Sequence, residues 1–93
     1  YAYYLSDAKD LGNNELMIYV RNMVDELEWF KSLSSSYKSL VKSEEQRYMQ
    51  SILRIAEIAV GRNDSEFVEK LEYEWSRVEP SYTLKEILSE QKR

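Results

Sequence analysis

The side chains that could carry chemistry in this chain are carboxylates, lysines, tyrosines and serines, because none of its 93 residues is Cys or His. The absence of Cys excludes disulfides, thiolate zinc sites and cysteine nucleophiles. The absence of His removes the commonest general base and the commonest transition-metal ligand. The composition therefore favours a non-catalytic protein without a metal, a cofactor or a small-molecule substrate.

The carboxylates of the segment SEFVEKLEYEW, residues 65–75, are the candidates for a metal site. Glu69 and Glu72 are three residues apart, so they would be neighbours on a helix. A site for a hard cation needs more oxygen ligands than this pair supplies, and no His completes one for a transition metal. Glu66, Lys70 and Glu74 follow the four-residue spacing of an ordinary ladder of surface charges, which is the interpretation we adopt.

The same segment argues against a helix-turn-helix over residues 48–75. Its second helix would be the recognition helix, and it would present four glutamates to the DNA phosphates. The sign of this charge excludes that mode of binding.

Basic side chains are concentrated in the middle of the chain. Residues 31–62 carry a net charge of +3, whereas residues 1–30 carry −4 and residues 63–93 carry −3. Their spacing places each group of cations on one side of a helix, where it could follow phosphates without reading sequence. The alternative is a solvated face that pairs with the acidic helices. The nucleic-acid interpretation uses Lys31, Lys38, Lys42, Arg47, Arg54 and Arg62.

Aromatic residues are more numerous than the predicted core requires, with eight Tyr and two Trp. Tyr3, Tyr19 and Tyr73 fall outside the apolar stripes of their predicted helices. Amphipathic aromatic side chains outside a core are typical of protein interfaces. These three residues therefore predict a surface for a protein partner or for a second copy, unless another helix or the terminal arm covers them.

Helical spacing of apolar residues begins at the first residue. One short helix is predicted over residues 1–11, before Gly12. A second begins at Leu16 and keeps a strict heptad spacing that extends to Tyr37 and Val41. The apolar positions of its first half are Leu16, Val20, Met23, Leu27 and Phe30.

The serine-rich stretch SLSSSYKSLVKSEEQRYMQ, residues 32–50, decides whether the chain forms one domain or two. Its heptad spacing indicates a helix with a kink at Ser34–Ser36 rather than a flexible linker, because serines weaken a helix by hydrogen bonding to its backbone. Ser43 and Gln46 have the spacing of a capping box, which predicts a turn near Lys42 and Ser43.

Three more helices are predicted after this turn. The third ends at Gly61 and has a wide apolar face, so we expect it to be the most buried, and we expect Leu53 to matter more for stability than Leu84. Residues 63–66 form a second capping-box pattern before a helix that ends ahead of Pro80. Thr83 caps a short last helix.

Short connections between amphipathic helices predict an all-α fold, an antiparallel up-and-down bundle of four main helices plus a short C-terminal helix. Residues 1–93 form a single domain in this interpretation. No apolar run is long enough to span a bilayer, so we expect a soluble, intracellular protein. The first residue is not Met, which indicates a piece of a longer protein. The residue usage would suit a thermophilic source.

The sequence thus predicts a non-catalytic helical module for assembly or protein interaction, which self-associates. The alternative is a sequence-independent nucleic-acid-binding or nucleoprotein structural domain, for example a DNA-packaging or coat component. Its basic patch would lie on the central helices. Salt dependence separates the two, because phosphate binding weakens steeply with ionic strength.

Overall fold

The computed structural model describes residues 10–91, and these form five helices and no strand. The helices are α1 (Asn13–Lys31), α2 (Ser35–Leu40), α3 (Lys42–Gly61), α4 (Ser65–Ser76) and α5 (Leu84–Gln91). The all-α prediction is confirmed. The helix predicted over residues 1–11 falls, except for its last two residues, outside the described residues, so the four-helix up-and-down arrangement stays a prediction.

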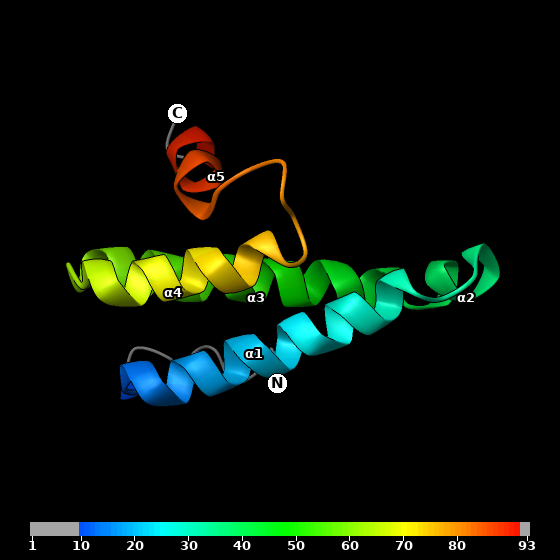
Figure 1. Cartoon of the computed structure of the whole chain (residues 1–93), viewed down its shortest axis with the longest axis horizontal. Coiled ribbons are helices and arrows are strands. Elements are labelled where there is room, and N and C mark those ends of the chain that lie inside the picture. The colour runs from blue at the N-terminus through cyan, green and yellow to red at the C-terminus, as the bar shows by residue number, and fades with distance from the viewer. Residues whose placement is uncertain (1–9, 92–93) are drawn as a thin grey trace.

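Three helices surround the core (Figure 1). Each of α1, α3 and α4 packs against the other two, and α5 packs across α3 and α4. The short α2 contacts α3 and lies at one end of the elongated molecule, whereas the turn between α3 and α4 lies at the other end. The extents of the molecule are 41 × 26 × 23 Å.

The apolar seam predicted for α1 is confirmed. All five of its seam residues are buried, and Met17 and Val24 widen the same face. The expectation that the third helix is the most buried is wrong, because α1 buries more side chains than α3 does. The reason is that the first nine residues of α3, up to Gln50, include no fully buried side chain. The core-facing part of α3 starts at Ser51.

The helix predicted through the serine-rich stretch is interrupted, which corrects the interpretation as a continuous kinked helix. Helix α1 ends at Lys31, and Ser34 adopts an extended conformation (φ −66°, ψ 163°) at the N-cap position of α2. The hydroxyl of Ser32 donates to the Trp29 carbonyl at 2.7 Å. Serine side chains that bond the local backbone, as Ser32 does, stabilise such breaks, whereas the Ser34 side chain makes no capping hydrogen bond to α2.

The capping predictions have different outcomes at the three later helices. The turn predicted near Lys42 lies at Val41, the residue that separates α2 from α3. The capping box predicted at Ser43 is not formed, because no side chain caps α3. The second predicted box is displaced: Asp64 caps α4 by accepting from the Phe67 amide at 3.1 Å. Thr83 caps α5 as predicted, accepting from the Glu86 amide at 3.1 Å.

The start of α1 is fastened to the turn between α3 and α4. Asn63 has a φ of 56°, a left-handed conformation that Asn tolerates, and this reverses the chain after α3. Arg62 donates to the Asn13 side-chain oxygen at 2.8 Å and to the Leu11 carbonyl at 2.7 Å. The amide of Asn13 donates to Asp64 at 2.7 Å. These bonds position the first turns of α1 and α4 side by side.

The C-terminal helix belongs to the core. Leu84 is 1% exposed and Leu88 is also buried, whereas Leu53 is only partly buried. The Leu84 amide donates to Glu72 at 2.5 Å, and the indole of Trp75 donates to the Tyr82 carbonyl at 3.0 Å. Their burial indicates that Leu84 contributes more to stability than Leu53, which is the reverse of the order expected from the sequence.

Candidate interaction surfaces

The six cations predicted to bind nucleic acid do not form one patch. Lys42 and Arg62 flank α3, so they lie about 30 Å apart at a rise of 1.5 Å per residue. Arg62 is engaged in the hydrogen bonds that fasten α1, and Arg54 pairs with Glu57 at 3.7 Å. The ammonium of Lys31 donates to the Val78 carbonyl. These three side chains already have partners within the fold, which sequence spacing did not reveal.

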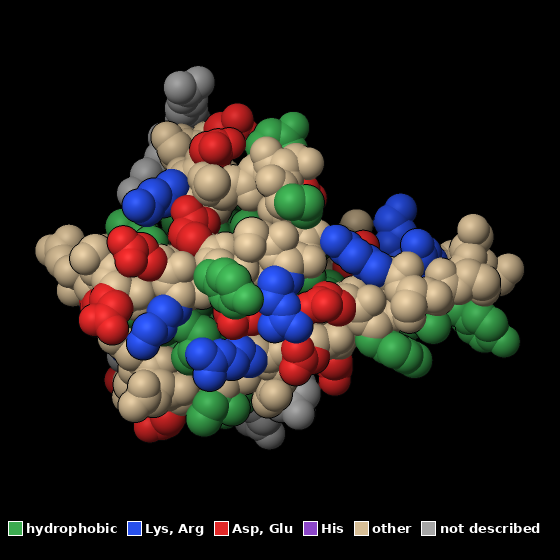
Figure 2. Space-filling model, in the orientation of Figure 1, with side chains coloured by type: hydrophobic (Ala, Val, Ile, Leu, Met, Phe, Trp, Pro, Cys, Tyr) green, Lys and Arg blue, Asp and Glu red, His purple; other side chains and the backbone are tan. Residues whose placement is uncertain are grey.

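The remaining cations, Lys38, Lys42 and Arg47, belong to α2 and the first part of α3. All three are exposed, and none makes an ion pair with another described residue. In Figure 2, Lys and Arg side chains gather on one side of the projecting end of the molecule that carries α2. The basic patch is thus smaller than predicted and confined to this end.

The same end exposes apolar side chains. No side chain of α2 is buried, and Leu40 is 74% exposed and Tyr37 61% exposed. Figure 2 shows hydrophobic side chains on the projecting end, on the side opposite to the cations. We call the exposed apolar pair Tyr37 and Leu40 the corner surface. The heptad spacing had assigned Tyr37 to a buried seam, so sequence reasoning missed this surface.

The three tyrosines predicted to form a protein interface are placed differently. Tyr3 lies outside the described residues. Tyr19 is partly buried and packs against the core, so it offers little surface. Tyr73 is 68% exposed on α4, as expected for an interface residue. Trp29 and Tyr82 are also exposed.

Tyr73 shares its face of α4 with charged side chains of both signs, because Lys70 lies three residues before it and Arg77 four residues after it. Glu69 is four residues before Tyr73 and Glu66 is seven before it, which places all three on one side of the helix. Glu66 forms an exposed ion pair with Lys70 at 3.6 Å, and Glu69 pairs with no other described residue. We call Glu66, Glu69 and Tyr73 the α4 surface.

A cluster of ion pairs joins α1 to α4 beside this surface. Arg77 contacts Glu74 at 2.7 Å, Asp25 at 3.1 Å and also Glu28, and Arg21 contacts the second oxygen of Glu74 at 3.6 Å. The hydrogen bond to Glu74, supported by the one to Asp25, holds the pKa of Arg77 above its usual value. Arg77 therefore stays charged and links the two helices.

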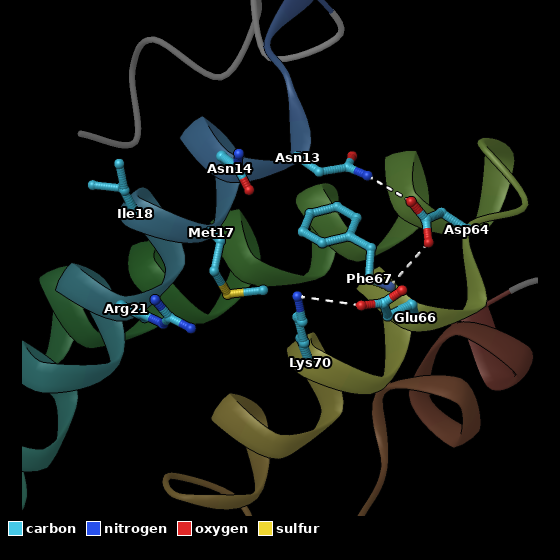
Figure 3. Close-up of a pocket in the computed structure, with 9 residues that line it drawn as sticks. All are labelled: Asn13, Asn14, Met17, Ile18, Arg21, Asp64, Glu66, Phe67 and Lys70. Atoms are coloured by element: carbon cyan, nitrogen blue, oxygen red, sulfur yellow. Dashed lines mark hydrogen bonds and ion pairs between the residues drawn. The ribbon is translucent and has the colours of Figure 1, made fainter.

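A depression opens between the first turns of α1 and α4 (Figure 3). Met17 and Phe67 lie at its centre, and polar side chains surround them. Asn13 bonds Asp64, and Lys70 pairs with Glu66. Because these polar groups already partner one another, the depression indicates no particular ligand.

Residues 10–91 contain neither a cluster of metal ligands nor a membrane-spanning helix. No group of three or more acidic side chains in this part of the chain is arranged to hold a metal ion. None of the described helices is both long and apolar enough to cross a membrane.

Comparisons of the chain with protein-family models, with curated proteins and with solved structures found no match. The functional argument therefore rests on the two surfaces alone.

Proposed function

We propose that the chain is a single helical-bundle domain with a non-catalytic role in assembly, and that it self-associates through the corner surface. The observation that carries this proposal is the exposure of Leu40 and Tyr37 on a helix that buries no side chain. Removing a large apolar side chain from water contributes about 1.5 to 3 kcal/mol of favourable free energy. Burial of Tyr37 and Leu40 against a partner would therefore favour association. Exposed aromatic side chains such as Tyr37 are also enriched in protein interfaces.

Sedimentation velocity over a range of concentrations tests this proposal. We expect the weight-average mass of the wild type to rise with concentration. The double variant Tyr37→Gln with Leu40→Gln should remain monomeric at every concentration, while its circular dichroism stays helical because neither side chain supports the core. Ile18→Gln is the matched control, since it removes a similarly exposed apolar side chain from α1. A wild type that is monomeric throughout, or a control that behaves like the double variant, contradicts the proposal.

A second candidate function is sequence-independent nucleic-acid binding, and the unpaired cations Lys38, Lys42 and Arg47 favour it. The overall charge of −4 supplies no general attraction, so binding has to come from this local group. We expect fluorescence anisotropy with a DNA duplex at about 50 mM salt to detect weak binding if this function holds. Replacing the three cations by Glu should abolish the signal. Absence of binding by the wild type at this salt concentration eliminates the candidate for this chain.

A further inference from the structure

We propose that self-association exchanges α1 between two copies of the chain. In the exchanged dimer the hinge, residues 32–34, becomes helical, so that α1 continues into α2 as one helix and packs on α3 and α4 of the other copy. This inference rests on the proposed function and specifies how the two corners meet. It starts from a conflict: the sequence between Phe30 and Tyr37 keeps the spacing of a continuous helix, but the structure breaks the helix there.

The apolar spacing of α1 continues in phase beyond the hinge. Its alternating steps of four and three residues, set by Leu16 to Phe30, run through α2 and into α3 as far as Ile55. Two helices that fold back around a corner need not share one phase, whereas a continuous helix has to keep it to present a single apolar face. The positions after Phe30 are Ser34, Tyr37, Val41, Glu44, Tyr48, Ser51 and Ile55.

The break itself is short. Ser34 is extended, whereas Ser32 already has helical angles (φ −81°, ψ −10°). On the other side of α2, helical hydrogen bonds run through Val41: its amide donates to the Tyr37 carbonyl at 3.3 Å, and its carbonyl accepts from the Glu45 amide at 2.9 Å. Only the hinge therefore has to change for α1 to continue toward α3. Short hinges of this kind favour the exchange of an element between copies.

The exchanged dimer keeps the core and covers the corner surface. In it, α1 makes the same contacts with α3 and α4 of the second copy as it makes in the closed chain, so no core burial is lost. In the closed chain, Phe30 stacks on Tyr48 with ring centroids 6.0 Å apart. One heptad closer to the corner, the same register places Tyr37 of one copy against Val41 of the other. Tyr37, which the closed chain leaves 61% exposed, thus gains an apolar neighbour.

A proline after the hinge separates exchange from the docking of two closed chains. Ser35→Pro holds Ser34 out of the helical conformation and cannot lie inside a continuous helix, but it leaves the corner surface in place. We expect this variant to stay monomeric in sedimentation velocity at concentrations where the wild type associates. The matched control is Ser65→Pro, at the first position of α4 after the extended Asp64, which should associate like the wild type.

The opposite change should strengthen association. Ser32→Ala with Ser34→Ala removes the hydroxyl that bonds the Trp29 carbonyl and raises the helix propensity of the hinge. Ser34 makes no capping hydrogen bond, so its replacement does not weaken α2. Because each copy carries both changes, the dissociation constant should fall by about tenfold or more. An unchanged dissociation constant contradicts a hinge that becomes helical.

Cross-linking shows directly which chain α1 packs on. The chain has no Cys, so introduced cysteines are the only thiols. Lys31 on α1 and Glu45 on α3 line the same depression, and the variant with Lys31→Cys and Glu45→Cys can be joined there by a short bismaleimide. In the associated protein we expect the reagent to join two chains, which gives a covalent dimer on a denaturing gel. With Ser35→Pro added, it should join the two cysteines of one chain.

These measurements distinguish failure of the exchange from failure of self-association. If the protein associates but the links form only within single chains, or if Ser35→Pro associates as the wild type does, α1 is not exchanged and the closed corners dock instead. If Ser65→Pro also loses association, a general effect of proline explains the loss and the role of the hinge is rejected. If the wild type is monomeric at every concentration, both the proposed function and the exchange fail.

Discussion

The buried carboxylate of Glu74 lies 2.7 Å from the guanidinium of Arg77, the C-cap residue of α4. Glu74 is 5% exposed, so its carboxylate oxygens have to be satisfied by neighbouring side chains instead of water. Arg21 supplies a second, longer contact to the same carboxylate. Arg77 also reaches Asp25 and Glu28 on α1, so a single side chain satisfies a buried acid and connects two helices.

Replacing Arg77 by Met should therefore destabilise the fold, since Met keeps an apolar stem but leaves Glu74 with Arg21 alone. Breaking a fully buried pair costs about 3 to 5 kcal/mol, and we expect about 1 to 3 kcal/mol here, because the Arg77 side chain is 35% exposed. Urea denaturation measures the difference. The matched control is Lys70→Met, which removes an exposed pair and should cost less than about 1 kcal/mol. Equal costs for the two variants would argue against a structural role for the Arg77 cluster.

Leu84→Ala should cost about 2 to 5 kcal/mol, the range for truncating a large core side chain. Leu53→Ala should cost clearly less, because Leu53 is only partly buried while Leu84 is almost fully enclosed. Thermal or urea denaturation gives both values. If Leu53→Ala proves the more damaging change, then α5 does not pack on α3 and α4 as described.

Ser35→Pro tests whether the chain breaks after α1. Ser35 is the first residue of α2, and Ser34 before it is extended, which is the backbone that a following proline requires. We expect the stability to change by less than about 1 kcal/mol. In a continuous helix the same proline would cost about 3 kcal/mol or more. Asn22→Pro, in the middle of α1, is the control that should show this larger loss in urea denaturation.

Asp64→Ala and Ser43→Ala compare a side chain that caps a helix with one that does not. Removing Asp64 leaves the Phe67 amide without its acceptor and breaks the bond from Asn13, so we expect a loss of about 0.5 to 2 kcal/mol. Ser43 makes no cap, so Ser43→Ala should be neutral or slightly stabilising through its higher helix propensity. A loss at Ser43 equal to that at Asp64 would indicate that the predicted capping box forms in solution.

The sequence was sufficient to predict α3, α4, α5 and the inner face of α1, where the heptad spacing coincides with contact to two other helices, but it did not predict the break between α1 and α2. The same spacing wrongly predicted that Tyr37 is buried. Periodicity shows which side chains share a face of a helix, but it does not show whether another helix covers that face. The length of α4 explains why no helix covers the face that carries Tyr37. With 12 residues, α4 is about 18 Å long and cannot accompany α1 and α3 to the corner, so the corner is left uncovered.

The candidate surfaces were predictable only in part, and for a related reason. Tyr73 was identified because it falls off the apolar stripe of its helix, and it is exposed. Arg62 was assigned to a basic patch, but its guanidinium bonds Asn13 and the Leu11 carbonyl some fifty residues away in the chain. A contact between such distant residues has no local signature in the sequence.

The small size of α2 has a consequence for the strength of any contact made by the corner. Six residues without a buried side chain gain little beyond the cost of starting a helix, so the amide hydrogens of residues 35–40 should exchange with solvent much faster than those of α1. The apparent affinity of a surface falls with the fraction of time for which it is formed. Ser36→Ala, which favours the helix without changing the corner surface, would then tighten association. In the proposed contact, the folding equilibrium of these six residues would thus set the affinity of the whole domain.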